Sequence, residues 1–310
     1  MRTAPLRSET AIPIASRRLA RVTRYVLERF PIPSYGPLII AVTICGRSAA
    51  SVASNRSPVL DWTAVATTIG VAAAFLQLRI LDDIRDAAAD RTGRPDRPLP
   101  RGLVTVAELR ALALVAAAVG TVVAATAGTT AVVSYIVAIG AIWFCGVDLP
   151  RRLPIGHDLL TTALVHSVIA PLVVLYAWTT VAGLAAVAPL AATLVLVWGA
   201  SLGVEIARKT VAPSEERNGI ETYSRAAGRT RAVRLAVAAV SVGCVGAGAF
   251  AAATGAPTVL AVAPVVAAVT LSVLARQLGQ RIGTTALRSG VVSMVLSALL
   301  WPLVVALALA

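Results

Sequence analysis

The chain has 310 residues, and its composition excludes an ordinary water-soluble globular domain. Hydrophobic residues make up 57% of it, charged residues only 14%, and the mean hydropathy is +0.81. Soluble domains average about 45–50% apolar and about 25% charged residues. The formal net charge of +13 would suit a nucleic-acid partner, but the basic residues are distributed as a membrane topology requires. We therefore expect no nucleic acid.

The N-terminal segment, residues 1–35, is basic but has no continuous apolar core, so a cleaved signal peptide is not expected. Four arginines alternate with small and aliphatic residues between positions 17 and 26: Arg17, Arg18, Arg21 and Arg24. This pattern predicts an amphipathic helix lying on the inner leaflet of a membrane.

Apolar runs long enough to cross a bilayer recur along the rest of the chain. They predict nine transmembrane helices at about residues 36–52, 63–81, 108–127, 129–147, 159–178, 181–204, 232–253, 257–275 and 286–310. The first run is short and is interrupted by Pro37. The sequence shows no linker, so the expected fold is a single all-α integral membrane domain covering residues 1–310.

The basic residues predict how this bundle is oriented. With nine spans, 26 of the 28 basic residues fall on the side of the N-terminus. By the positive-inside rule this side is cytoplasmic, giving N-in and C-out in a multi-pass protein of the inner (cytoplasmic) membrane. Two long charged segments, 79–110 and 205–234, then face the cytoplasm and are the candidate active-site segments.

The first charged segment carries four carboxylates where an apolar run ends: Asp82, Asp83, Asp86 and Asp90. On a helix, positions 82, 86 and 90 are successive i, i+4 neighbours, where like charges repel. A divalent cation would relieve that repulsion, and hard oxygen ligands favour magnesium, which commonly bridges carboxylates and substrate phosphates. These four aspartates are therefore candidate catalytic residues and metal ligands.

Arginines surround this aspartate cluster. Pro95 and Pro98 exclude a regular helix after it and predict a fixed, extended connector. Guanidinium groups on a rigid loop suit phosphate recognition, although a solvated, salt-bridged loop remains an alternative for any one of them. The candidate substrate-binding arginines of this segment are Arg79, Arg94, Arg97 and Arg101.

The second charged segment contains glutamates in place of aspartates. Glu205, Glu215 and Glu216 are candidate ligands of a second metal, with Glu205 favoured because it ends an apolar run much as Asp82 does. Arg208 and Lys209, the only lysine, are candidate phosphate-binding residues or ordinary cytoplasmic anchors. Tyr223 is a candidate hydrogen-bond donor to a phosphate, or a core residue.

Asp83, Asp86 and Asp90, followed by R-P-L-P-R-G at 97–102, resemble the first aspartate-rich motif of the UbiA superfamily of membrane prenyltransferases. The resemblance implies magnesium and an isoprenoid diphosphate bound within a bundle of nine helices. Asp82 stands where the family's motif usually has Asn. The family's second motif, D-x-x-x-D before a turn, has no aspartate here, although Glu215 precedes a turn at 218–220.

These observations predict a magnesium-dependent transferase that ionises an isoprenoid diphosphate and passes the prenyl group to an aromatic or other lipophilic acceptor. A first alternative is a terpene cyclase of the same superfamily, in which the cation is attacked by its own double bonds; the sequence Asp82–Asp86 also spells the D-D-x-x-D signature of class I terpene synthases. A second alternative is a membrane transporter, although its charges would be expected near the midplane.

Overall fold

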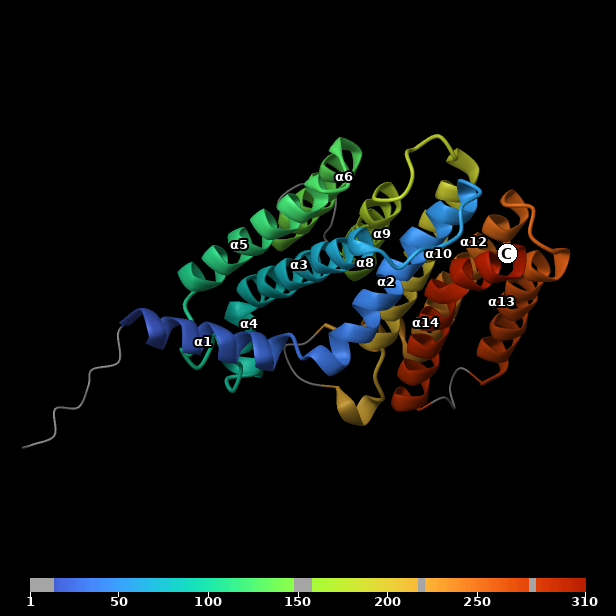
Figure 1. Ribbon diagram of the computed structural model, residues 1–310. Helices are drawn as coiled ribbons and strands as arrows, with labels where there is room; N and C mark the ends of the chain where they lie inside the picture. The colour runs from blue at the N-terminus through green and yellow to red at the C-terminus, as the bar shows by residue number, and fades with distance from the viewer. Residues whose placement is uncertain (1–13, 148–157, 217–220, 279–282) are drawn as a thin grey trace, which may run out of the picture.

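The computed structural model describes residues 14–147, 158–216, 221–278 and 283–310, and within these ranges the chain forms helices and turns without any strand. Figure 1 shows a bundle of long helices, with a separate N-terminal helix lying across one end. The all-α prediction is confirmed for these ranges. Residues 1–13 of the predicted amphipathic segment and the turn expected at 218–220 lie outside them.

The helices follow the predicted order along the chain. The N-terminal part contains α1 (Ile14–Arg29), α2 (Ile32–Ala53), α3 (Trp62–Arg85), α4 (Ala87–Gly93), α5 (Val106–Ala125) and α6 (Thr129–Gly146). The C-terminal part contains α8 (Leu159–Ser167), α9 (Ile169–Thr179), α10 (Val187–Arg208), the 3-10 helix η1 (Pro213–Glu215), α11 (Tyr223–Ala227), α12 (Arg229–Ala253), α13 (Thr258–Leu278) and α14 (Thr284–Leu309).

Eight helical segments of the described chain are long and apolar enough to cross a membrane. One of them, Leu159–Thr179, combines α8 and α9, which are separated at Val168. Pro171 explains this break, because proline has no amide hydrogen to donate to the preceding turn. The remaining predicted span, at about residues 257–275, corresponds to α13, in which the apolar stretch is the shorter Thr258–Val273.

Polar side chains cap the start of α3, which carries the first aspartate cluster, and of α5, which follows the turn segment. The Asp61 carboxylate accepts a hydrogen bond from the Ala64 amide (2.8 Å) and starts α3. Thr105 and Glu108 form a reciprocal capping box at the start of α5. Such caps satisfy amide groups that have no partner within the helix itself, so α3 and α5 begin at defined residues.

Helices α10 and α12 pack closely through glycines. A Cβ atom added at Gly199 would lie 2.3 Å from the backbone nitrogen of Gly243, and one added at Gly246 would lie 2.5 Å from that of Leu196. Small residues of this kind let helix backbones approach each other in a membrane, where the hydrophobic effect does not drive association. The glycines therefore set the spacing between these two helices.

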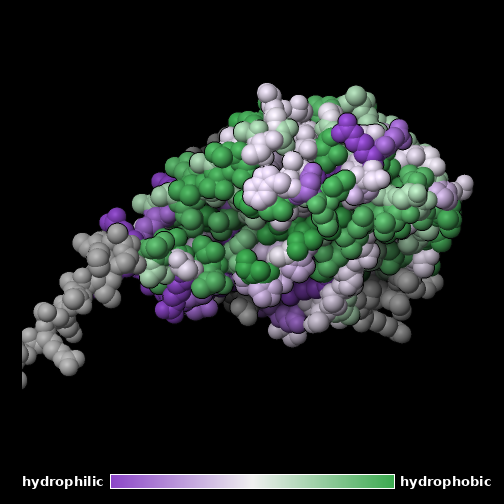
Figure 2. Space-filling model, viewed as in Figure 1, coloured by the Kyte–Doolittle hydropathy of each residue, from purple (hydrophilic) through white to green (hydrophobic). Residues whose placement is uncertain are grey.

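The surface agrees with a lipid environment. The face shown in Figure 2 is largely hydrophobic; hydrophilic residues gather near α1 and along the lower edge, with a smaller group at the upper right. On α5 a row of aliphatic side chains is exposed: Leu114, Val115, Val119 and Val122. In Figure 1, α1, α4, η1 and α11 lie toward the same end of the bundle, so the two charged segments predicted to form the site are on one side.

Candidate functional site

The first aspartate cluster lies where α3 passes into α4. The Asp86 amide donates to the Asp82 carbonyl (2.9 Å), and the Asp90 amide donates to the Asp86 carbonyl (2.9 Å). Asp86 is both the C-cap residue of α3 and the N-cap residue of α4. The i, i+4 spacing predicted for these three residues is therefore confirmed, even though their side chains have different surroundings.

Asp83 is buried and fully engaged with cationic and polar groups. Its carboxylate accepts two hydrogen bonds from Arg29 (2.9 and 2.7 Å), one from the Tyr25 hydroxyl (3.0 Å) and one from Arg79. Burial, together with the Asp83 charge, raises the pKa of Tyr25 far above its usual range, so its hydroxyl remains a donor. This carboxylate fastens α1 to α3 and has little capacity left for a metal ion.

Asp82 and Asp86 share one cation, Arg85. The Arg85 guanidinium lies 2.8 Å from the Asp82 carboxylate and 3.2 Å from that of Asp86. The side chain of Asp82 is 30% exposed and that of Asp86 is 45% exposed. Two carboxylates with a single guanidinium leave a local excess of negative charge, and both can be reached from outside the protein.

Asp90 is buried and paired with Arg97. The chain that follows α4, at residues 94–102, is a succession of turns, with amide-to-carbonyl hydrogen bonds from Arg97 to Arg94 (3.1 Å) and from Arg101 to Arg97 (3.0 Å). The extended connector predicted here is therefore wrong. Proline presets the backbone for turn positions as readily as for extended chain, and Gly102, at φ +76°, provides the left-handed residue that ends the series.

The turn segment is held from the other side by α1. The Arg101 guanidinium donates to both oxygens of Glu28 (2.7 and 2.8 Å) and to the Asp96 carbonyl (2.9 Å). The hydrogen bond from Arg101 lowers the pKa of the Glu28 carboxyl. A further ion pair joins Arg21 of α1 to Glu108 of α5 at 2.5 Å. The predicted amphipathic helix is therefore bound to the aspartate-bearing helix and its loop.

In the second charged segment, Glu205 lies near the end of α10 between two cations. Its carboxylate is 2.7 Å from the Arg208 guanidinium and 3.0 Å from the Lys209 ammonium. Asp82 interacts electrostatically with both Arg208 and Glu205, and Arg208 also interacts with Asp86. The ends of α3 and α10 therefore face each other, as expected from the sequence.

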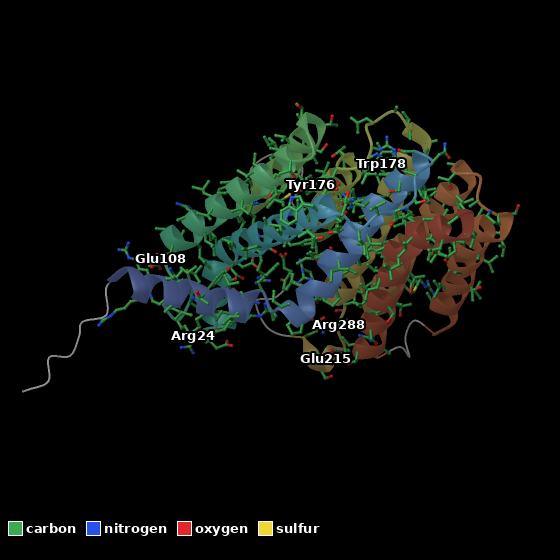
Figure 3. The ribbon with its side chains drawn as sticks, in the orientation of Figure 1. Arg24, Glu108, Tyr176, Trp178, Glu215 and Arg288 are labelled. Atoms are coloured by element: carbon green, nitrogen blue, oxygen red, sulfur yellow. The ribbon has the colours of Figure 1, made fainter. Side chains whose placement is uncertain are left out.

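Glu215 and Glu216 lie elsewhere and hold the chain between α10 and α12. Glu216 accepts hydrogen bonds from Thr222 (2.8 Å) and Ser224 (2.7 Å). Glu215 accepts from the Ala212 amide (3.3 Å) and interacts with Arg288 at the start of α14. Figure 3 shows Glu215 and Arg288 together at the lower end of the bundle. Their role as metal ligands stays a prediction that this arrangement does not itself favour.

Tyr223 is buried rather than exposed to substrate. Its hydroxyl donates to the Leu159 carbonyl at the start of α8 (3.1 Å), and its amide donates to the Lys209 carbonyl (2.9 Å). Burial raises the pKa of this phenol, which therefore stays protonated. Of the two interpretations open from sequence, these contacts favour the core residue.

Several residues that shape the site have no motif of their own. Tyr25, Glu28 and Arg29 all lie in α1, more than fifty positions before the groups that they bind. The alternation of arginines predicts this helix, but only the position of Arg29 at its end, one turn beyond Tyr25, could have suggested a shared target. On α3, the buried Gln77 accepts from the Trp143 indole (3.2 Å) and donates to the Tyr135 hydroxyl (3.2 Å), joining α3 to α6.

The donor set at the end of α3 fits magnesium. Asp82 and Asp86 offer two accessible carboxylates one helical turn apart, and magnesium is typically held by one or two carboxylates, with phosphate and water completing the shell. Among the residues that the structure describes, no three or more histidine, cysteine, aspartate or glutamate side chains gather closely enough to form an all-protein metal site. The geometry therefore suits a metal that is shared with a bound phosphate.

This fold and this end of the bundle define a polytopic membrane protein with an acidic site facing a basic one. Residues 39–289 match the UbiA prenyltransferase family, and the chain belongs to that family. No curated protein matches the sequence.

Solved structures show the same fold at low sequence identity. A structure described as giving insights into the biosynthesis of digeranylgeranylglyceryl phosphate synthase in membranes is similar with a TM-score of 0.66 and 15% identity, covering 93% of this chain and 99% of that one. An apo UbiA homologue from Aeropyrum pernix K1 gives a TM-score of 0.64 at 15% identity, covering 86% and 95%. A UbiA homologue from Archaeoglobus fulgidus gives 0.59 at 11% identity, covering 93% and 98%.

Proposed function

We propose that this protein is a magnesium-dependent membrane enzyme that ionises an isoprenoid diphosphate and transfers the prenyl group to an aromatic or other lipophilic acceptor. One observation carries the proposal. Asp82 and Asp86 carry an excess of negative charge. They face Arg208, which is paired with Glu205, across the end of the bundle. An acidic half that suits a metal beside a basic half that suits phosphate is what ionisation of a diphosphate requires.

The residues of the chain divide this work between them. Asp82 and Asp86 would hold magnesium, which when bound neutralises charge on the leaving diphosphate. Arg208 and Lys209 would contact phosphate oxygens from α10. Arg97 and Arg101, held in the turns by Asp90 and Glu28, would mainly keep that loop in place.

Asp83 positions this apparatus and does not itself contact the metal. The bonds from Arg29 and Tyr25 fix the last turns of α3, and thus the direction of the neighbouring Asp82. Arg79 adds a third partner, and its buried Nε atom has no hydrogen-bond partner within the described ranges. A buried donor of this kind usually finds an acceptor, and a phosphate oxygen would serve.

The prenyl chain would lie among the apolar helices, where water is excluded and an allylic cation survives until it meets a nucleophile. The similar structure whose description names digeranylgeranylglyceryl phosphate synthase supports an acceptor-using reaction. We propose that the site opens to the cytoplasmic face of the inner membrane, because most basic residues lie in segments at that end.

A terpene cyclase remains the second candidate, because Asp82 replaces the Asn expected at that position of the motif. Purified protein in lipid nanodiscs should be incubated with magnesium and geranyl, farnesyl or geranylgeranyl diphosphate, with and without a lipid extract as a source of acceptors. A prenylated product that forms only with the extract supports the transferase. Cyclic hydrocarbons formed from the diphosphate alone would overturn it in favour of the cyclase.

A further inference from the structure

The two halves of the site carry opposite local charge. On α3, two carboxylates, Asp82 and Asp86, share the single guanidinium of Arg85. On α10, one carboxylate, Glu205, is shared by the two cations of Arg208 and Lys209. The first group has one negative charge in excess and the second has one positive charge in excess. A divalent cation is therefore attracted to α3 and repelled from α10.

The other acidic residues of the second segment do not change this balance. Glu216 is bound by Thr222 and Ser224, and Glu215 by the Ala212 amide, both in the connection that precedes α12. A second metal at Glu205 would have to displace both of its cations and would find no further carboxylate supplied by these two glutamates. Glu205 is better placed to orient Arg208 and Lys209 than to ligate a metal.

The total charge leads to the same conclusion. The ion-pair network of the described site contains five carboxylates, Asp82, Asp83, Asp86, Asp90 and Glu205, and six cations, Arg29, Arg79, Arg85, Arg97, Arg208 and Lys209. A diphosphate ester carries about −3 near neutral pH, about −2 of it on the terminal phosphate. One magnesium ion added to the net charge of +1 balances this value, and a second would leave a surplus in a site adjoining the membrane.

We propose that this enzyme binds one catalytic magnesium ion, at Asp82 and Asp86, and that Arg208 and Lys209 replace a second metal by contacting the diphosphate directly. Glu205 is then a positioning residue for these two cations. The inference rests on the proposed function, because it assumes that a diphosphate occupies the space between α3 and α10. It states in addition how many metal ions accompany that diphosphate.

The test is a count of bound metal. The full chain in detergent is titrated with Mn²⁺ in the presence of saturating inorganic pyrophosphate, and free Mn²⁺ is measured by electron paramagnetic resonance after correction for Mn²⁺–pyrophosphate in protein-free solution. We expect one Mn²⁺ per chain. A value of two per chain would overturn the single-metal proposal and leave the proposed function intact, whereas no binding of either Mn²⁺ or pyrophosphate would overturn both.

Variants separate the two halves of the site. Lys209→Met and Arg208→Met should each weaken pyrophosphate binding about tenfold, the usual result of removing one charge-assisted contact, while the Mn²⁺ count stays at one. Asp86→Asn should remove the Mn²⁺ itself. Arg110→Met, an exposed arginine at the start of α5, is the matched control for net charge and should change neither quantity. A loss of Mn²⁺ in Lys209→Met would contradict the proposed division.

Glu205→Gln adds an independent measurement. If Glu205 only positions the two cations, the variant keeps one Mn²⁺ and weakens pyrophosphate binding by less than the loss of Lys209. If Glu205 is a metal ligand, the Mn²⁺ count falls, and the proposal fails. Circular dichroism and the thermal unfolding temperature establish that each variant is folded.

Discussion

Arg29 binds Asp83 with two parallel hydrogen bonds, 2.9 Å from Nε and 2.7 Å from Nη2, and thereby joins the end of α1 to the last turn of α3. The exposed fraction of the Asp83 side chain is 5%, and that of Arg29 is 17%. A bidentate pair at this depth is geometrically specific. It gives this aspartate of the motif a structural role that differs from that of its neighbours.

Asp83→Asn should lower stability more than metal affinity. Removing one charge of a buried, hydrogen-bonded pair costs about 3 kcal/mol because the partner is left uncompensated, and here Arg29 and Arg79 both lose the carboxylate charge and one of its two acceptor oxygens. Thermal unfolding in nanodiscs should show a marked decrease in the midpoint, with Mn²⁺ binding retained in the folded protein. Asp86→Asn is the matched change and should have the opposite profile; equal effects on both properties in both variants would refute the distinction.

Arg85→Gln should tighten metal binding. The Arg85 guanidinium contacts both Asp82 and Asp86, so a metal ion must compete with it for their oxygens. Replacing it with a neutral side chain should lower the Mn²⁺ dissociation constant about three- to tenfold, corresponding to roughly 1 kcal/mol. Arg91→Gln, an exposed arginine of α4, provides the control. Weaker Mn²⁺ binding in Arg85→Gln would show that the guanidinium supports the metal instead of competing with it.

Acid should weaken the attachment of α1 to the turn segment. The pKa of Glu28 is lowered by its hydrogen bond with Arg101. A carboxyl with a depressed folded-state pKa stabilises above its unfolded pKa, about 4.3, and loses that contribution as pH falls through the folded value. The pair is partly exposed, so the effect should be below about 1 kcal/mol.

The measurement is the unfolding midpoint of wild type and Glu28→Gln between pH 7 and pH 3. We expect wild type to be slightly more stable at pH 7 and the difference to shrink as pH falls below about 4.3, through the lowered pKa of the Glu28 carboxyl. A difference that is constant over this range would show that the Glu28 charge does not contribute.

Gly199→Ala should disrupt the contact between α10 and α12. The added Cβ would lie 2.3 Å from the Gly243 nitrogen, and a helix backbone, unlike a flexible side chain, cannot move away cheaply. Overpacking of this kind costs about 1–3 kcal/mol. Gly140→Ala in α6 is the control, since nothing lies within 4 Å of its added Cβ, and it should be neutral or slightly stabilising. The two unfolding midpoints would be compared; similar values would disprove the steric argument.

The sequence was most informative where local periodicity determines structure. The spacing of Asp82, Asp86 and Asp90 predicts one helical face, and the backbone bonds between these residues confirm it. The partners of Asp83 could not be predicted in the same way, because Tyr25 and Arg29 lie 58 and 54 residues earlier in the chain. Such contacts depend on how α1 crosses the bundle, which no local pattern records.

The turn segment and the second cluster show a similar limit. Prolines at 95, 98 and 100 exclude a helix but allow either an extended chain or turns, and the bonds that decide between them come from Arg97 and Arg101. Glu216 is of a residue type that can bind a metal, yet the hydroxyls of Thr222 and Ser224 donate hydrogen bonds to its carboxylate in the folded chain. Residue type indicates what a side chain can bind, whereas tertiary contacts determine what it does bind.

The most direct test of the central claim is magnesium-dependent binding of a non-hydrolysable prenyl diphosphate, geranylgeranyl thiolodiphosphate, to the purified chain, with Asp82→Asn/Asp86→Asn as the site variant. Asp96→Asn, an exposed carboxylate in the neighbouring turns, is the control. We predict that magnesium strengthens binding to wild type and Asp96→Asn, and that the site variant binds at least about tenfold more weakly without any magnesium effect. Equal, magnesium-dependent binding by all three proteins would contradict the assignment of Asp82 and Asp86 as the metal site.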